Sequence, residues 1–84
     1  MITIHLHFRE KPFFSWEPGA LDGLSDAALK LVTGQLLIDA AEEARKLKAG
    51  ETEMVLFRYG IAIWARRTAS GAELTIQEVQ HDAA

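Results

Sequence analysis

Two histidines on one short segment are the residues best placed to do chemistry. His5 and His7 are separated by one residue, and in an extended segment both side chains reach the same face, roughly 6.5–7 Å apart. Such a pair can chelate a metal, so a metal-dependent enzyme built on it is one hypothesis. A metal site needs a third and usually a fourth ligand, however, and His81 is the only other histidine. We therefore expect two polar residues on the solvent side of a strand, with no metal and no cofactor.

Covalent catalysis has little support in the sequence. The hydroxyls of Ser15, Ser25 and Ser70 lie in a proline-rich loop, a helix cap and a turn, and no G-x-S-x-G elbow surrounds them. The six glycines form neither a P-loop nor a dinucleotide-binding motif. The absence of cysteine excludes disulfides and thiolate chemistry, and fits a reducing compartment. We expect no catalytic residue and a soluble, cytoplasmic protein.

The C-terminal half of the chain predicts a three-stranded meander. Its strands span 53–58, 61–67 and 72–79, with turns at Tyr59-Gly60 and Thr68–Gly71.

In this register Arg66 lies opposite Glu53 on one side and Glu73 on the other. The charges and the apolar pattern agree on one pairing scheme, which makes the register credible. One face is then apolar and carries Met54, Leu56, Ile61, Ile63, Ala65, Leu74 and Ile76.

The opposite face of the meander mixes aromatic and polar side chains. It carries Val55, Phe57, Trp64 and Arg66, with Thr75 and Gln77 beside them. Aromatic rings interleaved with arginine could stack nucleic-acid bases, but the net charge of −3 and the two glutamates beside Arg66 argue against phosphate binding. A protein interface anchored on Phe57, Trp64 and Arg66 is a further alternative, as is coverage by aromatic residues from elsewhere in the chain.

The N-terminal segment predicts another strand followed by an aromatic loop. Residues 2–9 alternate apolar and polar side chains without exception. Two placements of this strand fit: parallel to strand 53–58 if elements simply alternate in direction, or reversed by the long loop 12–24. That loop carries Phe13, Phe14 and Trp16, too many aromatics for a loose linker.

Residues 25–49 predict one long helix. Ser25 is a plausible N-cap and Gly50 is well placed just beyond the C-terminus. One broad apolar face should lie on the sheet, formed by Leu29, Val32, Leu36, Ala40, Ala44 and Leu47.

A second stripe on this helix includes Leu31, Gly34, Ile38 and Ala41. Small residues alternating with large ones would admit a close backbone contact, so we expect a homodimer through this stripe, dissociated by Ile38→Glu. Coverage of the stripe by Phe13, Phe14 and Trp16 is the alternative.

These elements define the fold class and the main functional hypothesis. The 84 residues predict a single α+β domain, with one helix on a four-stranded, mostly antiparallel sheet and a polar tail at 80–84. Because the same three aromatics cannot cover both apolar surfaces, one surface should remain for a partner. We expect a non-catalytic protein-binding module that homodimerises or docks on a larger protein, such as a small inhibitor or accessory protein of phage or bacterial type.

Overall fold

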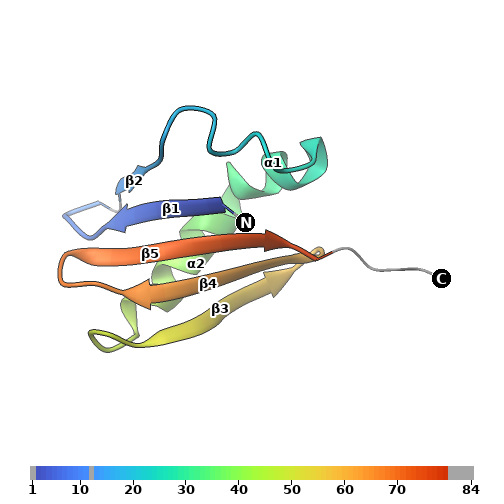
Figure 1. The fold of residues 1–84 in the computed structure, drawn as a ribbon. Helices are drawn as coiled ribbons and strands as arrows, with labels where there is room; N and C mark the ends of the chain where they lie inside the picture. Colours follow the sequence, from blue (N-terminus) through green and yellow to red (C-terminus); the bar gives the residue numbers. More distant parts are fainter. Residues whose placement is uncertain (1, 12, 80–84) are drawn as a thin grey trace.

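The computed structural model describes residues 2–11 and 13–79, which form one antiparallel sheet with two helices against one of its faces (Figure 1). The order of the strands in the sheet is β2-β1-β5-β4-β3. In chain order the elements are β1 (Ile2–His7), β2 (Phe13–Ser15), α1 (Asp26–Val32), α2 (Gln35–Arg45), β3 (Thr52–Arg58), β4 (Ile61–Arg67) and β5 (Gly71–Glu78).

The α+β class is confirmed, but the sheet has five strands within the described residues rather than four. The additional strand is β2, which begins the segment expected to be a loop and pairs antiparallel with β1. This hairpin reverses the chain, so that β1 runs antiparallel to β5 and therefore also opposite to β3. The strand expected over 2–9 ends earlier, at His7. The polar tail and Pro12 lie outside the described residues.

The single helix expected over 25–49 is wrong in two respects: it is broken near its middle, and it ends at Arg45. The Thr33 hydroxyl donates to the Leu29 carbonyl oxygen at 2.8 Å, which completes the last turn of α1. The Gly34 N–H donates to the Leu31 carbonyl oxygen at 3.2 Å, and α2 begins at the next residue, Gln35. The Ser25 N-cap is confirmed, because its hydroxyl accepts the Ala28 N–H at 3.1 Å.

The predicted meander register is correct for β4 and β5 and wrong for the first half of β3. Arg66 lies opposite Glu73 as expected, but a β-bulge between Met54 and Leu56 adds one residue to β3. Residues before the bulge therefore change face. Thr52 instead of Glu53 lies opposite Arg66, and Met54 leaves the helix side for the outer face.

The core lies between the helices and one face of the sheet. Helix α2 packs on β3, β4 and β5, and its small side chains let it approach closely. Ala41, expected on the second helix stripe, belongs to this core with 1% of its surface exposed. The largest fully buried side chains are Ile4, Leu6, Val32, Ile61, Ile63, Leu74 and Ile76.

Candidate functional site

A groove lies between the β2 segment and the junction of the two helices, and we call it the helix-junction groove. It has a volume of about 350 Å³. The side chains of its lining are apolar apart from the Thr33 hydroxyl and the Trp16 indole N–H, and none is charged: Phe13, Phe14, Trp16, Leu21, Thr33, Gly34, Leu37 and Ile38.

The groove owes its position to the helix break. Because α1 ends at Val32, Thr33 and Gly34 form the corner between the helices, and both residues line the groove. A side chain at Gly34 would bring its Cβ within 3.3 Å of the Lys30 carbonyl oxygen, which is tighter than ordinary packing. Glycine therefore suits the chain at this corner.

The groove has a buried floor and an exposed rim. Leu37 is buried, and Phe14 and Leu21 pack against the core as partly buried side chains. In contrast, Phe13 and Ile38 expose 55% and 49% of their surface. Trp16 exposes 45%, so three large apolar side chains around one groove are about half open to water.

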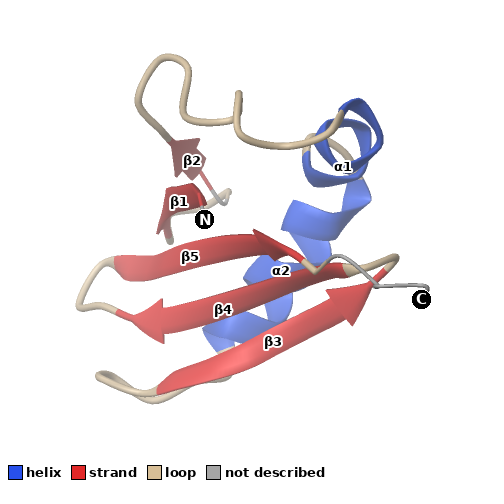
Figure 2. Ribbon diagram, turned by 45° about the vertical axis from the view of Figure 1, so that its right-hand side comes forward, coloured by secondary structure: helices blue, strands red, loops and turns tan. Residues whose placement is uncertain are grey.

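A second apolar surface lies on the opposite side of the molecule, and we call it the outer sheet face. Both ribbon views show the helices on one side of the sheet, and no segment that the structure describes covers the other side (Figures 1 and 2). Met54 lies directly opposite Trp64, and Phe57 lies opposite Ala62 on the same two strands. Met54, Phe57 and Trp64 expose 48%, 49% and 43% of their surfaces.

Beside this apolar corner, the outer sheet face carries one internal ion pair. The Arg66 Nη2 donates to Glu73 Oε2 at 2.7 Å, and Glu73 lies opposite His5 on the next strand. Arg66 is about half exposed. The positive charge available to a phosphate is therefore largely neutralised by the neighbouring carboxylate.

The β1–β2 hairpin determines the surroundings of the two N-terminal histidines. His7 Nε2 lies 3.2 Å from Ser15 Oγ, and its ring centroid is 5.8 Å from that of Phe13. His5 is exposed, and its strand neighbours are Ser15 and Glu73.

The residues described around these histidines bear on the metal and covalent hypotheses. Within residues 2–11 and 13–79, no three histidine, cysteine or acidic side chains are grouped so as to hold a metal. His81 lies outside this range. The Ser15–His7 pair has the distance of a nucleophile and its base, but within the same residues no carboxylate hydrogen-bonds to His7 to orient its ring.

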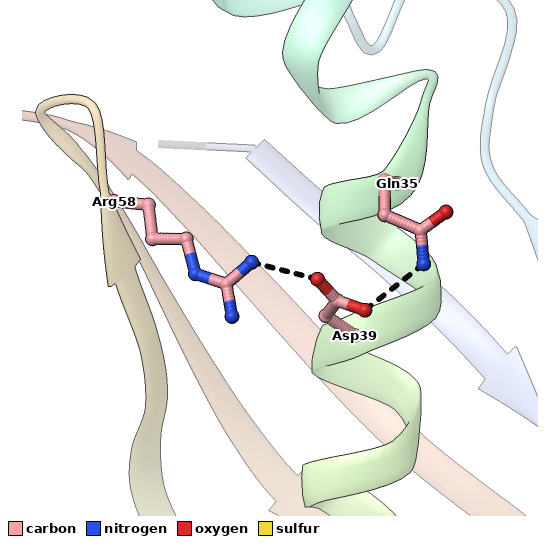
Figure 3. Close-up of polar contacts among 3 residues, drawn as sticks. All are labelled: Gln35, Asp39 and Arg58. Atoms are coloured by element: carbon pink, nitrogen blue, oxygen red, sulfur yellow. Dashed lines mark hydrogen bonds and ion pairs between the residues drawn. The ribbon is translucent and has the colours of Figure 1, made fainter.

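A polar cluster connects α2 to the β3–β4 hairpin (Figure 3). Asp39 accepts hydrogen bonds from Gln35 Nε2 at 3.0 Å and from Arg58 Nη1 at 2.7 Å. The bond from Gln35, followed by that from Arg58, lowers the pKa of the Asp39 carboxyl below its ordinary value of 3.8. This arrangement fixes the helix against the sheet rather than presenting a reactive group.

Two arginines surround Phe8 at the other end of α2. The guanidinium carbons of Arg45 and Arg67 lie 5.0 Å and 4.3 Å from the Phe8 ring centroid. Arg67 Nη1 also donates to the carbonyls of Thr68 and Gly71, at 3.2 Å and 2.7 Å. These cation–π contacts and hydrogen bonds connect the ends of α2, β1 and β4, and we assign them a structural role.

The structure divides the predicted interface residues between the two surfaces. Phe13, Phe14 and Trp16 join Gly34 and Ile38 at the helix-junction groove. The outer sheet face holds Phe57, Trp64 and Arg66, whereas Leu31 is partly buried and packs against the core, and Ala41 is part of that core.

Sequence reasoning missed several residues of both surfaces. Leu37 and Leu21 belong to the groove, and Met54 belongs to the outer sheet face. Gly34 could have identified Leu37, because a helix that starts anew after this glycine buries both Leu36 and Leu37 in its first turn. No local signal identified Met54, whose position depends on the bulge.

The fold and these surfaces define an α+β protein with one helix-covered and one open sheet face. Comparisons with protein-family models, with curated proteins and with solved structures find no match to this chain. Neither helix among the described residues is long and apolar enough to cross a membrane.

Proposed function

We propose that this protein is a non-catalytic protein-binding module that docks on a larger protein through the helix-junction groove. The observation that carries the proposal is the half exposure of Phe13, Trp16 and Ile38 around one uncharged groove. By analogy of size and surface alone, a small inhibitor or accessory protein of phage or bacterial type is the class that fits best.

The exposed rim of the groove would supply most of the binding energy. Apolar surface removed from water contributes about 25 cal/mol per Å², and aromatic side chains carry much of the binding energy at protein interfaces. Phe13 and Trp16 stand on a short edge strand and the segment after it, while Ile38 stands on a helix anchored in the core. A partner side chain placed in the groove would cover Trp16 and Ile38 together, while Phe13, which pairs with His7 on β1, borders the groove from the edge of the sheet.

The groove also restricts the chemistry of its partner. Its volume of about 350 Å³ is near the lower end of ligand sites, and its lining has no charge to attract an ionic group. One or two protruding apolar side chains from a loop or helix of the partner match these properties. A phosphorylated or strongly charged ligand does not.

Site-specific photo-crosslinking in the native host tests the proposal. A benzophenone amino acid in place of Ile38 lies at the groove, whereas the same group in place of Lys30, which is exposed on α1, provides a matched control. We expect one protein to be crosslinked from position 38 and not from position 30.

Two further variants make the result specific. Trp16→Ala should strongly reduce crosslinking from position 38, because it removes one side of the groove rim. Trp64→Ala, on the opposite surface, should leave it unchanged. Equal labelling from positions 30 and 38, or labelling from position 38 that is insensitive to Trp16→Ala, would contradict the proposal.

The two alternative functions have weaker support. Nucleic-acid binding through the outer sheet face would need a positive surface, and Arg66 is paired with Glu73. A metal-dependent enzyme built on His5 and His7 would need a third ligand beside them. Salt-sensitive binding of an oligonucleotide would favour the first alternative, and one retained equivalent of zinc would favour the second.

A further inference from the structure

We propose that the outer sheet face binds a second copy of this chain, forming a symmetric dimer through face-to-face packing of the two sheets. This inference goes beyond the docking function, because it uses the surface on the other side of the molecule from the helix-junction groove. Three observations on the face carry it: its apolar corner, its balanced charges and its area.

The apolar corner is formed by neighbouring side chains on β3 and β4. Met54 and Trp64 are direct cross-strand neighbours, and Phe57 stands opposite Ala62, one row further along the same two strands. The three large side chains are each about half exposed. The β-bulge is what adds Met54 to this corner, so the irregularity in β3 enlarges the apolar surface that a partner would cover.

The charges of the face suit a copy of the same face. Among the described residues, Arg66 on β4 and Glu73 on β5 are cross-strand neighbours on this face, and His5 and His7 on β1 lie on the same face. One cation and one anion cancel, although the whole chain carries a net charge of −3. A neutral face with an offset pair of opposite charges is complementary to its own copy turned about a twofold axis, whereas a face of one sign would repel its copy.

The area of the face matches a reversible dimer. Four strands of about seven residues, spaced ~4.8 Å apart and rising ~3.3 Å per residue, present roughly 450 Å² before side-chain relief is counted. Two such faces bury about 900 Å² in total before side-chain relief is counted, near the lower limit of specific protein interfaces. We therefore expect a dissociation constant on the order of micromolar.

Sedimentation velocity measurements between about 1 and 200 µM test the dimer directly. The key variant is Trp64→Glu, and its matched control is Ile38→Glu, which places the same charge at a similarly exposed apolar residue on the other surface. We expect a wild-type dimer whose dissociation constant rises at least about tenfold in Trp64→Glu and stays unchanged in Ile38→Glu.

Charge variants test whether the partner is a copy. Arg66→Glu gives both faces two negative charges and should weaken the dimer about tenfold. The double variant Arg66→Glu, Glu73→Arg restores a neutral face and should return the dissociation constant to near the wild-type value. If both variants weaken the dimer equally, the self-complementary face is ruled out.

A fluorescence measurement locates the contact. The chain has two tryptophans, so Trp16→Phe leaves Trp64 as the only emitter. Its emission should shift to shorter wavelength as the protein is concentrated through the dimer transition, because the face-to-face contact removes the indole from water. Unchanged emission from Trp64 across a dimer transition would place the interface elsewhere.

The remaining outcomes also decide the question. A wild-type monomer throughout the range would overturn the proposal, and so would a dimer broken by Ile38→Glu and not by Trp64→Glu. Circular dichroism shows whether each variant is folded, and Met54→Lys replaces Trp64→Glu if the latter unfolds. None of these measurements depends on the groove partner, so either proposal can fail without the other.

Discussion

Ser25 joins the start of α1 to the end of β5 through Glu78. Its hydroxyl donates to Glu78 Oε1 at 2.6 Å, and its backbone N–H donates to Glu78 Oε2 at 3.2 Å. The same hydroxyl oxygen caps the helix by accepting the Ala28 N–H. One serine therefore fixes the beginning of the helical layer to the sheet.

Stability should depend on pH through this contact. The hydrogen bonds from Ser25, that of the hydroxyl first, lower the pKa of Glu78 below its ordinary value of 4.5. A carboxyl with a lowered pKa in the folded state stabilises that state above the unfolded pKa, and this stabilisation is lost as the pH falls through the folded pKa. Glu78→Gln should therefore be less stable than wild type at neutral pH, and the difference should shrink below pH 4.5 and vanish only below the lowered pKa of the folded state.

Urea melts over a series of pH values check this expectation. Glu17→Gln is the matched control, since Glu17 is exposed and its carboxylate makes no hydrogen bond among the described residues. It should show no comparable difference at any pH. A deficit in Glu78→Gln that persisted unchanged into acid would mean that packing, and not the ionised carboxylate, is responsible.

The register of β4 predicts very different losses of stability for substitutions at two residues three positions apart. Ile63 is fully buried beneath the helices, so Ile63→Ala should lower the free energy of unfolding by about 2–4 kcal/mol. Arg66 is half exposed, and Arg66→Ala should cost under about 1 kcal/mol in dilute solution. Urea melts of both variants at low protein concentration measure the difference, and the reverse order would mean that the strand has slipped by one residue.

The β3–β4 turn offers a stabilising substitution. Tyr59 and Gly60 have φ angles of 53° and 73°, the left-handed region that a two-residue type I′ turn requires. Tyr59 is 76% exposed, so replacing it removes little packing. Tyr59→Asn should raise stability by about 0.5–1 kcal/mol, because asparagine adopts this region at lower cost.

Gly60→Ala provides the opposite sign at the neighbouring position. It forces a β-carbon into the left-handed region and should lower stability by about 1 kcal/mol. Thermal melts followed by circular dichroism distinguish the two variants. A destabilised Tyr59→Asn would show that the tyrosine ring makes contacts that outweigh its backbone strain.

Gly71 is required for the pairing of β1 with β5. A β-carbon at this position would overlap the Leu6 carbonyl oxygen on the adjacent strand. Gly71→Ala should therefore cost about 3 kcal/mol, since a backbone atom must move. Gly23→Ala is the control: its β-carbon would meet only Ile2 Cδ1, at 3.8 Å, and should be tolerated within about 0.5 kcal/mol in the same urea melts. Equal costs would mean that the close contact between Gly71 and the Leu6 carbonyl oxygen does not set the effect.

Much of the fold follows from local patterns in the sequence. Strict alternation identified β1, the Ser25 cap identified the start of the helical region, and Tyr59-Gly60 identified the hairpin turn. The Arg66–Glu73 pair was found because charge and hydrophobic pattern required the same register. Each of these features is determined by residues close together in sequence or on paired strands.

The remaining features depend on contacts that local patterns do not contain. A single glycine is compatible with a continuous helix, so the break at Gly34 became visible only with the Thr33 cap in place. The three residues of β2 are too few to show a period of two. The groove forms because this short strand folds back on β1 and carries its aromatic residues to the helix junction, which is a long-range event.

The bulge in β3 decides which residues of that strand reach the outer sheet face and which face the core. If the pairing of Leu56 with Ile63 continued without the bulge, Val55 would lie opposite Trp64, Met54 would turn into the core, and Glu53 would turn outward, opposite Arg66. The outer sheet face would then lose one of its three large apolar side chains and gain a carboxylate that no positive charge balances. A shift of one residue in the pairing thus separates a surface suited to self-recognition from one that would repel its own copy.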